Sequence, residues 1–165
     1  MKMAKTFKVR SHVVYPGHGV AEIVAIEEKK IDKNIEKYYV LELVENRTRI
    51  MVPVKNAEKV GLRNIISNAQ VKKIIKILKS SPEEGDPNWN RRHTEYLDKI
   101  KTGSIEKACE VYRDLMFAKN EKELSFGEKK ILDTTRKLLV TEISFAKKID
   151  ENKAEEMLSE IFSGK

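Results

Sequence analysis

The spacing of apolar positions changes once along the chain, near Ser67. Before this point the apolar residues form short runs rich in Val, Ile and Tyr, at 7–15, 20–26, 38–44 and 50–54. Such runs, separated by turn residues, are typical of β-strands. The strongest turn is the segment Pro16-Gly17-His18-Gly19. Four or five short strands with tight turns predict a small curled sheet or a partly open barrel.

After Ser67 the apolar residues recur with a period of about 3.6, which predicts amphipathic helices. Ser67 with Gln70 and Ser125 with Glu128 both match the capping box that opens a helix. Helices are also expected from near Asn88 to 103, after Ser104, and over 154–162, whereas the acidic, Pro- and Gly-containing segment 80–87 should break the first helix. The predicted fold class is therefore α+β, with a β domain at 1–64 and an all-α five-helix bundle at 67–165.

The charge distribution favours an anionic partner. The chain carries a formal net charge of +7 and has a pI of about 9.3. Residues 1–66 hold 13 Lys and Arg against 8 Asp and Glu, a net of +5, whereas residues 67–165 hold 20 against 18, a net of +2. Because the helical half is nearly neutral, it would bind DNA through a local patch and not through its mean field.

Several classes of protein are disfavoured. No apolar run is long enough to span a bilayer, no apolar stretch follows the N-terminal lysines, and Cys109 is the single cysteine, so we expect a cytoplasmic protein. Phosphate-binding loops, His/Cys clusters and nucleophile elbows are missing from the sequence. We therefore expect no enzymatic activity, no cofactor and no metal site, and an inert, buried Cys109.

Two patches in the helical half could bind nucleic acid. The segment 86–93 contains Trp89, the only tryptophan, followed by Arg91 and Arg92. Trp89 could anchor the core, or it could be a wedge or stacking platform beside phosphate-binding arginines. Lys129 and Lys130 open the long helix, where backbone N–H groups already favour an anion, although an ordinary solvated surface is the alternative.

One patch in the β half could bind a protein. If the run 50–54 is a regular strand, Arg49 and Met51 share one side of it and Ile50 takes the other. Together with Lys29, these residues would form an exposed face suited to a protein partner. An edge strand that carries protective charges is an equally natural interpretation.

Several stretches together resemble the CarD/CdnL family of bacterial transcription regulators. They are Val13-Val14-Tyr15-Pro16-Gly17-His18-Gly19-Val20-Ala21, Tyr38-Tyr39-Val40-Leu41, Val52-Pro53-Val54, Asn56-Ala57, Val60-Gly61-Leu62-Arg63, Asn88-Trp89 with Arg91-Arg92, and Leu124-Ser125 with Gly127-Glu128-Lys129. The resemblance covers nearly the full chain in order. The Tyr-Pro-Gly-His-Gly-Val element alone is shared with transcription-repair coupling factors, which also carry motor domains with nucleotide-binding loops.

The resemblance implies a Tudor/SH3-like N-terminal barrel that binds the β subunit of RNA polymerase, and a helical domain that contacts promoter DNA at the upstream edge of the transcription bubble. Trp89 matches the family's minor-groove wedge, Arg91, Arg92 and Lys129 match positions near the DNA backbone, and Lys29 matches a basic position at the polymerase interface. The sequence departs from some relatives at two positions. A second interface position that is basic in those relatives is Met51 here, and Arg49 on the same strand face could supply the charge instead. Thr94 stands where some relatives have a lysine.

The expected function is stabilisation of the promoter open complex by a monomeric, nucleoid-associated regulator with low sequence specificity. Two alternatives stay open at this point. One is a nucleic-acid-binding protein that acts without polymerase through its SH3-like barrel, which strong, salt-sensitive binding to free DNA or RNA would favour. The other is a protein-interaction adaptor, in which Trp89 would anchor an interface with another protein.

Overall fold

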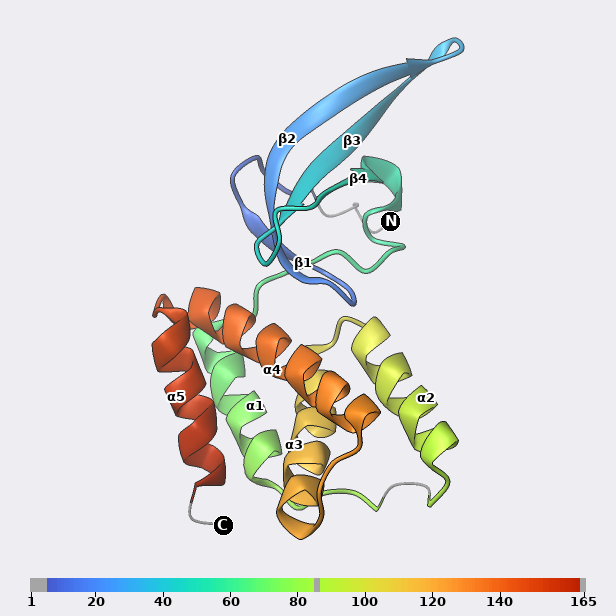
Figure 1. The fold of residues 1–165 in the computed structure, drawn as a ribbon. Helices are drawn as coiled ribbons and strands as arrows, with labels where there is room; N and C mark the ends of the chain where they lie inside the picture. Colours follow the sequence, from blue (N-terminus) through green and yellow to red (C-terminus); the bar gives the residue numbers. More distant parts are fainter. Residues whose placement is uncertain (1–5, 85–86, 164–165) are drawn as a thin grey trace. The chain divides into compact units, whose positions relative to one another are not determined.

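The computed structural model describes residues 6–84 and 87–163. The chain divides into two compact units, Met1–Ile65 and Ile66–Lys165. The first unit is built from strands and the second from helices (Figure 1). Asp86, at the start of the predicted Trp89 segment, lies outside the described residues.

The first unit is one antiparallel sheet of five strands in the order β4-β3-β2-β1-β5. Its elements are β1 (His12–Tyr15), β2 (Gly19–Ile31), β3 (Asn34–Leu43), β4 (Arg49–Pro53), the short 3-10 helix η1 (Val54–Asn56) and β5 (Arg63–Asn64). The core on its inner face is formed by Phe7, Val13, Ala21, Ile23, Tyr39, Leu41, Leu43, Val52, Ala57 and Leu62. Among the described strands β4 and β5 are the two edges, so the sheet is an open, barrel-like one, as the Tudor-like prediction requires.

The β2–β3 hairpin extends beyond the core as a long arm (Figure 1). Its outer part, from Glu27 to Lys37, is exposed except for Glu36, which is only partly buried, and Ile35 has 65% of its surface in solvent. The predicted strands 20–26 and 38–44 correspond to the buried base of this hairpin. The exposed arm was not predicted because neither of its faces carries an apolar alternation.

The prediction of one strand over 7–15 is wrong in its extent, since only His12–Tyr15 is a strand. Arg10 has φ +73°, a left-handed conformation that interrupts an extended chain. The apolar signal at Phe7 is nevertheless real. Its side chain is buried, its N–H donates to the Tyr39 hydroxyl at 3.1 Å, and the two rings meet edge to face. Phe7 therefore closes the core from outside the sheet.

The predicted turn between the first two strands is confirmed. Gly17 and Gly19 both have positive φ, +81° and +92°, which glycine adopts without a steric penalty. The His18 N–H donates to the Tyr15 carbonyl at 3.0 Å and closes the turn. The turn sets the β1–β2 register, in which Tyr15 pairs with Gly19 and Val13 pairs with Ala21.

The second unit contains the five predicted helices: α1 (Asn68–Lys79), α2 (Trp89–Lys101), α3 (Ile105–Glu121), α4 (Phe126–Lys147) and α5 (Glu151–Phe162). Both predicted capping boxes form. The Ser67 hydroxyl accepts from Gln70 N–H at 3.2 Å, and the Ser125 hydroxyl accepts from Glu128 N–H at 3.2 Å. In each box the side chain at the third helical position also accepts from the backbone N–H of the serine. The predicted α+β class with a helical bundle is therefore confirmed.

The helical core has a larger and a smaller part. The larger part joins α1, α3, α4 and α5 and includes Cys109, whose burial raises the pKa of its thiol. Glu142 is buried in the same unit and accepts from the Ile66 backbone N–H at 3.0 Å, so α4 holds the start of the bundle. The smaller part places α2 on α3 and α4 through Ile100, Val111, Leu115 and Ile131. This second cluster is what positions the start of α2.

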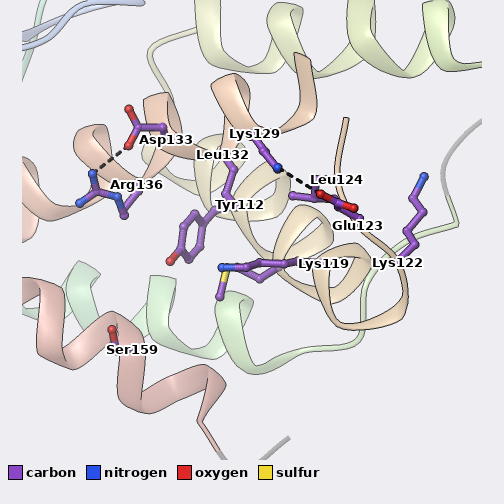
Figure 2. Close-up of a pocket in the computed structure, with 11 residues that line it drawn as sticks. Tyr112, Lys119, Lys122, Glu123, Leu124, Lys129, Leu132, Asp133, Arg136 and Ser159 are labelled. Carbon is purple, nitrogen blue, oxygen red and sulfur yellow. Dashed lines mark hydrogen bonds and ion pairs between the residues drawn. The ribbon is translucent and has the colours of Figure 1, made fainter. Parts of the chain in front are cut away.

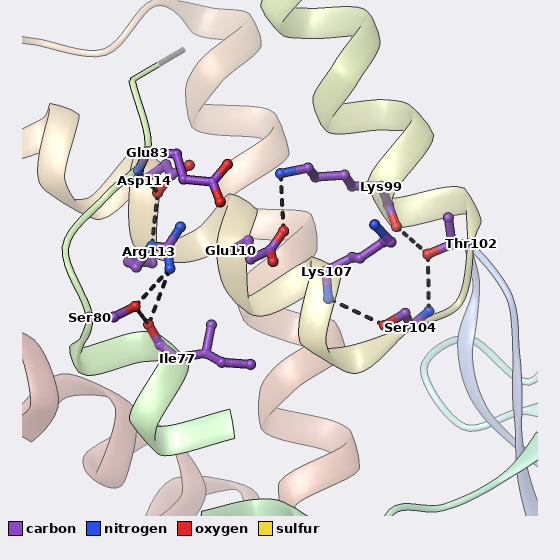
Figure 3. A network of polar contacts seen from close by, with 10 residues as sticks. All are labelled: Ile77, Ser80, Glu83, Lys99, Thr102, Ser104, Lys107, Glu110, Arg113 and Asp114. Carbon is purple, nitrogen blue, oxygen red and sulfur yellow. Dashed lines mark hydrogen bonds and ion pairs between the residues drawn. The ribbon is translucent and has the colours of Figure 1, made fainter. Parts of the chain in front are cut away.

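A polar network fixes the segment that leads from α1 toward α2 (Figure 3). Arg113 is buried on α3, and its guanidinium donates to the Ile77 carbonyl at 3.4 Å and to the Ser80 hydroxyl at 2.8 Å. It also donates to Asp114 at 2.9 Å, and Asp114 accepts from the Glu83 N–H at 3.4 Å. The chain after α1 is thus tied to α3 over several residues before it reaches Trp89.

Candidate nucleic-acid and protein interfaces

Trp89 is the first residue of α2, and its position is fixed by the cap of that helix. The Asn88 side chain accepts from the backbone N–H groups of Asn90 and Arg91, at 2.9 and 3.4 Å. An asparagine at this position satisfies donors that have no partner inside the helix. The predicted helix start near Asn88 is confirmed, and the indole therefore projects from a defined helix end.

The Trp89 side chain packs against α4 but is only partly buried. It contacts the smaller helical cluster, and a Cβ added to Gly127 would lie 3.2 Å from Trp89 Cζ2. Gly127 lies in the first turn of α4, so the first turns of α2 and α4 meet at this contact. The two interpretations of Trp89 left open by the sequence are compatible, since the ring is anchored on one side and accessible on another.

Arg92 lies over the indole. Its guanidinium carbon is 5.2 Å from the Trp89 ring centroid, a cation–π geometry, and its Nη1 donates to the Pro87 carbonyl at 3.5 Å. His93 meets the same ring edge-on at 5.2 Å between centroids. Arg92 is partly buried by these contacts, whereas Arg91 is exposed. The two arginines therefore differ in exposure, because neighbouring residues on a helix point in different directions.

The first turn of α4 adds an exposed aromatic residue that the sequence reasoning missed. Phe126 is 86% exposed, the most exposed of the large apolar side chains in the described chain. A signal for it exists in the sequence, because the helix positions four and seven residues later are Lys130 and Asp133, both polar. Phe126 thus lies on the polar face of its helix, away from the buried stripe.

Lys129 and Lys130 point to different sides of α4. Lys130 follows Gly127 by three residues and so lies on the side that faces Trp89, whereas Lys129 follows it by two and does not. Lys129 pairs with Glu123 at 3.6 Å, while Lys130 forms no ion pair with any residue that the structure describes. Trp89 therefore meets Arg92 and Gly127 directly, and helix spacing places Phe126 and Lys130 next to Gly127. Trp89, Arg92, Phe126 and Lys130 are here called the Trp89 patch. Lys129 lies on the side of α4 opposite Gly127.

In the first unit, the three predicted protein-binding residues share the outer face of the sheet. Lys29 pairs with Glu36 across β2 and β3, and Met51 pairs with Val40 across β3 and β4. These pairs are four residues apart along β3, about 13 Å. Arg49 lies two residues from Met51 on the same side of β4, as predicted, while Val52 is buried on the other side.

Two of these three side chains, Lys29 and Arg49, have a local partner. Lys29 Nζ lies 5.7 Å from the centroid of the Tyr38 ring, and Arg49 donates to Glu42 at 3.2 Å. Met51 is 37% exposed. Beside Lys29, hydrogen bonds from Lys55 and from the Tyr38 hydroxyl lower the pKa of Glu36. The face therefore combines an exposed apolar side chain with charges of both signs.

The described residues meet the requirements of neither a metal site nor a membrane-spanning helix. Within residues 6–84 and 87–163 there is no group of three or more His, Cys, Asp or Glu side chains able to hold a metal ion. No helix in this part of the chain is long and apolar enough to cross a bilayer.

Comparison with known proteins identifies the family. Residues 7–66 match the family model described as CarD-like/TRCF RID domain, and residues 73–159 match CarD, C-terminal domain. The chain is also 34% identical over 145 residues to "Putative transcription factor YdeB" of Bacillus subtilis (strain 168). The aligned region covers 88% of this chain and 95% of that protein. The chain belongs to the CarD family. The resemblance stated from the sequence is confirmed.

A solved structure, "CdnLNt from Myxoccoccus xanthus", is 41% identical and covers 41% of this chain and 96% of that chain, with a TM-score of 0.34. As a CarD-family protein, the chain is a transcription-associated regulator, and its family is one of transcription factors rather than enzymes. The match to a CarD-like/TRCF RID domain implies interaction with RNA polymerase.

Proposed function

We propose that this protein binds the β subunit of RNA polymerase through its N-terminal sheet and stabilises the promoter open complex through the Trp89 patch. The observation that carries the DNA contact is the meeting of two helix N-termini at Trp89, with Phe126 exposed beside it. The N-terminal ends of helices favour phosphate groups, because their backbone N–H groups and their dipole are positive. Arg92 and Lys130 add two formal positive charges at the same place.

The shape of the patch suits distorted DNA. Apolar wedges inserted between base steps, flanked by cationic side chains on the backbone, hold kinked or partly unstacked duplexes. Trp89 is held by the Asn88 cap, by Arg92 and by its packing on Gly127, so little conformational entropy is lost when it inserts. The recognised groups are phosphates and an unstacked step, which predicts low sequence specificity.

The edge of the N-terminal sheet supports the polymerase contact. β4 is an edge strand of five residues, and its backbone groups on the outer side lack a neighbouring strand among the described residues. Such an edge accepts an extended segment of another protein through main-chain hydrogen bonds, with side-chain contacts adding specificity. Arg49 and Met51 lie on this strand and face solvent, so they are placed to supply those contacts.

The proposed mechanism is a shift of equilibrium. A factor that binds the melted promoter more tightly than the closed one favours melting by the difference in its affinities. A patch that fits only a widened, partly unstacked minor groove has such a difference. Binding to polymerase raises the local concentration of the helical unit at the promoter, which allows a nearly neutral domain to act through a small patch.

Variants at the two surfaces should separate the two activities. Met51→Glu places a charge on the polymerase-binding strand and should weaken polymerase binding about tenfold. Phe126→Ala removes an exposed side chain and should leave polymerase binding intact, while shortening the lifetime of open complexes that the protein stabilises. If Phe126→Ala and Trp89→Ala both leave that lifetime unchanged, the helical unit binds another protein instead of DNA.

A further inference from the structure

A separate cleft lies on the helical unit, between α3, α4, α5 and the α3–α4 connection (Figure 2). Its volume is about 660 Å³, within the range of small-molecule sites. None of its lining residues comes from α2, so it is not part of the Trp89 patch. Its apolar lining includes Met116 and Leu132, and its charged lining comprises four cationic and two acidic side chains.

Tyr112 places a hydroxyl in this cleft without a partner. The residue is only 5% exposed, and its ring is held edge to face against Phe162 at 5.5 Å. Among the residues that the structure describes, the Tyr112 hydroxyl forms no hydrogen bond, and burial raises its pKa. Figure 2 shows the hydroxyl at the wall of the cleft. A hydroxyl that faces the cleft and has no protein acceptor can donate a hydrogen bond to a ligand bound there.

The cations around the cleft are not equally available. Arg136 pairs with Asp133 at 2.8 Å and with Glu155 at 2.7 Å, and its hydrogen bond lowers the pKa of Asp133. Lys129 pairs with Glu123. Lys119 forms no ion pair with the described part of the chain. Lys122 pairs with Glu128 at 3.8 Å. Of the four cations that line the cleft, Lys119 is thus the one without an ion pair among the described residues.

Lys119 and Tyr112 lie on the same stripe of α3. Tyr112, Met116 and Lys119 follow one another at spacings of four and three residues, which aligns them along one side of a helix. An anionic group could therefore accept from the Tyr112 hydroxyl and pair with Lys119, while an apolar body packs on Met116 and Leu132. A neutral ligand would leave Lys119 unpaired.

We propose that this cleft binds a small organic anion with an apolar body, a carboxylate or a phosphate ester that carries a short chain or a ring. The proposal does not depend on DNA or polymerase binding. The volume of the cleft suits a small molecule, its apolar wall suits the apolar body, and Lys119 with the Tyr112 hydroxyl suits the anionic group.

The test is a titration of the full-length ¹⁵N-labelled protein with octanoate and with phenyl phosphate, followed by amide chemical shifts. At least one of the two anions should shift the amides of Met116, Leu124 and Leu132 saturably at concentrations up to about 10 mM. Octanamide, which has the same chain without the charge, should bind at least tenfold more weakly. Saturation by neither anion, or equal binding of octanamide, would overturn the proposal.

Two variants test the assigned contacts. Lys119→Gln should weaken binding of the anion about tenfold, and Tyr112→Phe should weaken it about threefold or more while keeping the ring against Phe162. Lys72→Gln, a change of an exposed lysine on α1 outside the cleft, is the matched control and should bind as the unmodified protein does. Unchanged affinity in both cleft variants would contradict the proposed site even if an anion binds elsewhere.

Discussion

Replacing Gly127 on α4 by a larger residue should displace the Trp89 side chain on α2, and this displacement can be measured. A Cβ at Gly127 would lie 3.2 Å from Trp89 Cζ2, closer than the usual separation of carbon atoms in contact, about 3.5–4.0 Å. Gly127→Ala therefore requires the indole to move by a few tenths of an ångström. Gly127→Val adds two further methyl groups at the same place and cannot be accommodated by so small a shift.

The two substitutions should change the free energy of unfolding by different amounts. Alanine is favoured over glycine within a helix by up to about 1 kcal/mol, which offsets the tight contact, so the free energy of unfolding of Gly127→Ala should stay within about 1 kcal/mol of the unmodified protein. Gly127→Val combines overpacking with a β-branched side chain and should destabilise the protein by about 1–3 kcal/mol. Displacement of Trp89 should grow in the same order.

Fluorescence reports this displacement directly, because Trp89 is the only tryptophan. The emission maximum of Gly127→Val should move to longer wavelength as the indole leaves its contact with α4, and that of Gly127→Ala should move little. Urea unfolding of the same samples gives the free energies. Open complexes formed with Gly127→Val should be shorter-lived, although polymerase binding by the N-terminal unit is retained.

An unchanged emission maximum in Gly127→Val, together with unchanged stability, would refute the packing of Trp89 on α4. A shifted emission with an unchanged open-complex lifetime would instead show that the position of the indole does not matter for function. Ala69→Val, on an exposed position of α1, is a suitable control for the introduction of a β-branched residue into a helix.

Three further predictions concern charge. Lys130→Ala should reduce the slope of the logarithm of the DNA-binding constant against the logarithm of the salt concentration by about 1, because one phosphate contact is lost. Lys129→Ala, on the other side of α4, should change this slope less. Equal slopes for the two variants would contradict the division between the two lysines. Glu142→Ala should lower the free energy of unfolding by about 1–3 kcal/mol in urea titrations, since it removes the buried acceptor of the Ile66 N–H. Burial raises the pKa of Asp114, and the hydrogen bond from Arg113 partly opposes this rise. The folded state therefore holds the Asp114 proton more tightly than the unfolded state does. As a result, the contribution of Asp114 to stability falls as pH rises through the raised pKa. Arg113→Gln should raise that pKa further, so its loss of stability should be larger at about pH 7 than at about pH 4, and an equal loss at both would contradict the assignment.

The helices could be predicted well because their signals are local. The capping boxes at Ser67 and Ser125 and the apolar stripes between them lie within a few residues of the structure they determine. The strands were predicted less completely. The exposed arm of β2 and β3 has no buried face to mark it, and β5 has only two residues. The positive φ of Arg10 carries no sequence signal, which is why the first strand was predicted too long.

Trp89, Arg92 and Lys130 were singled out from the sequence as candidate DNA-binding residues, but their grouping with Phe126 was not predicted. Trp89 and Gly127 stood out separately in the sequence, and only the fold shows that they touch. That contact decides which side of α4 faces the indole, and it therefore separates Lys130 from Lys129. Phe126 could have been found from its place on the polar face of a predicted helix, because a large aromatic side chain there has no core to enter.

The most direct test of the account is the lifetime of RNA polymerase–promoter open complexes challenged with a competitor, with the unmodified protein, with Trp89→Ala and with Trp89→Phe. We expect a longer lifetime with the unmodified protein, loss of most of this effect in Trp89→Ala, and partial retention in Trp89→Phe, which keeps a flat ring on Gly127. Polymerase binding should be equal in all three. A lifetime that the unmodified protein does not extend, on a promoter whose open complex is short-lived, would contradict the account.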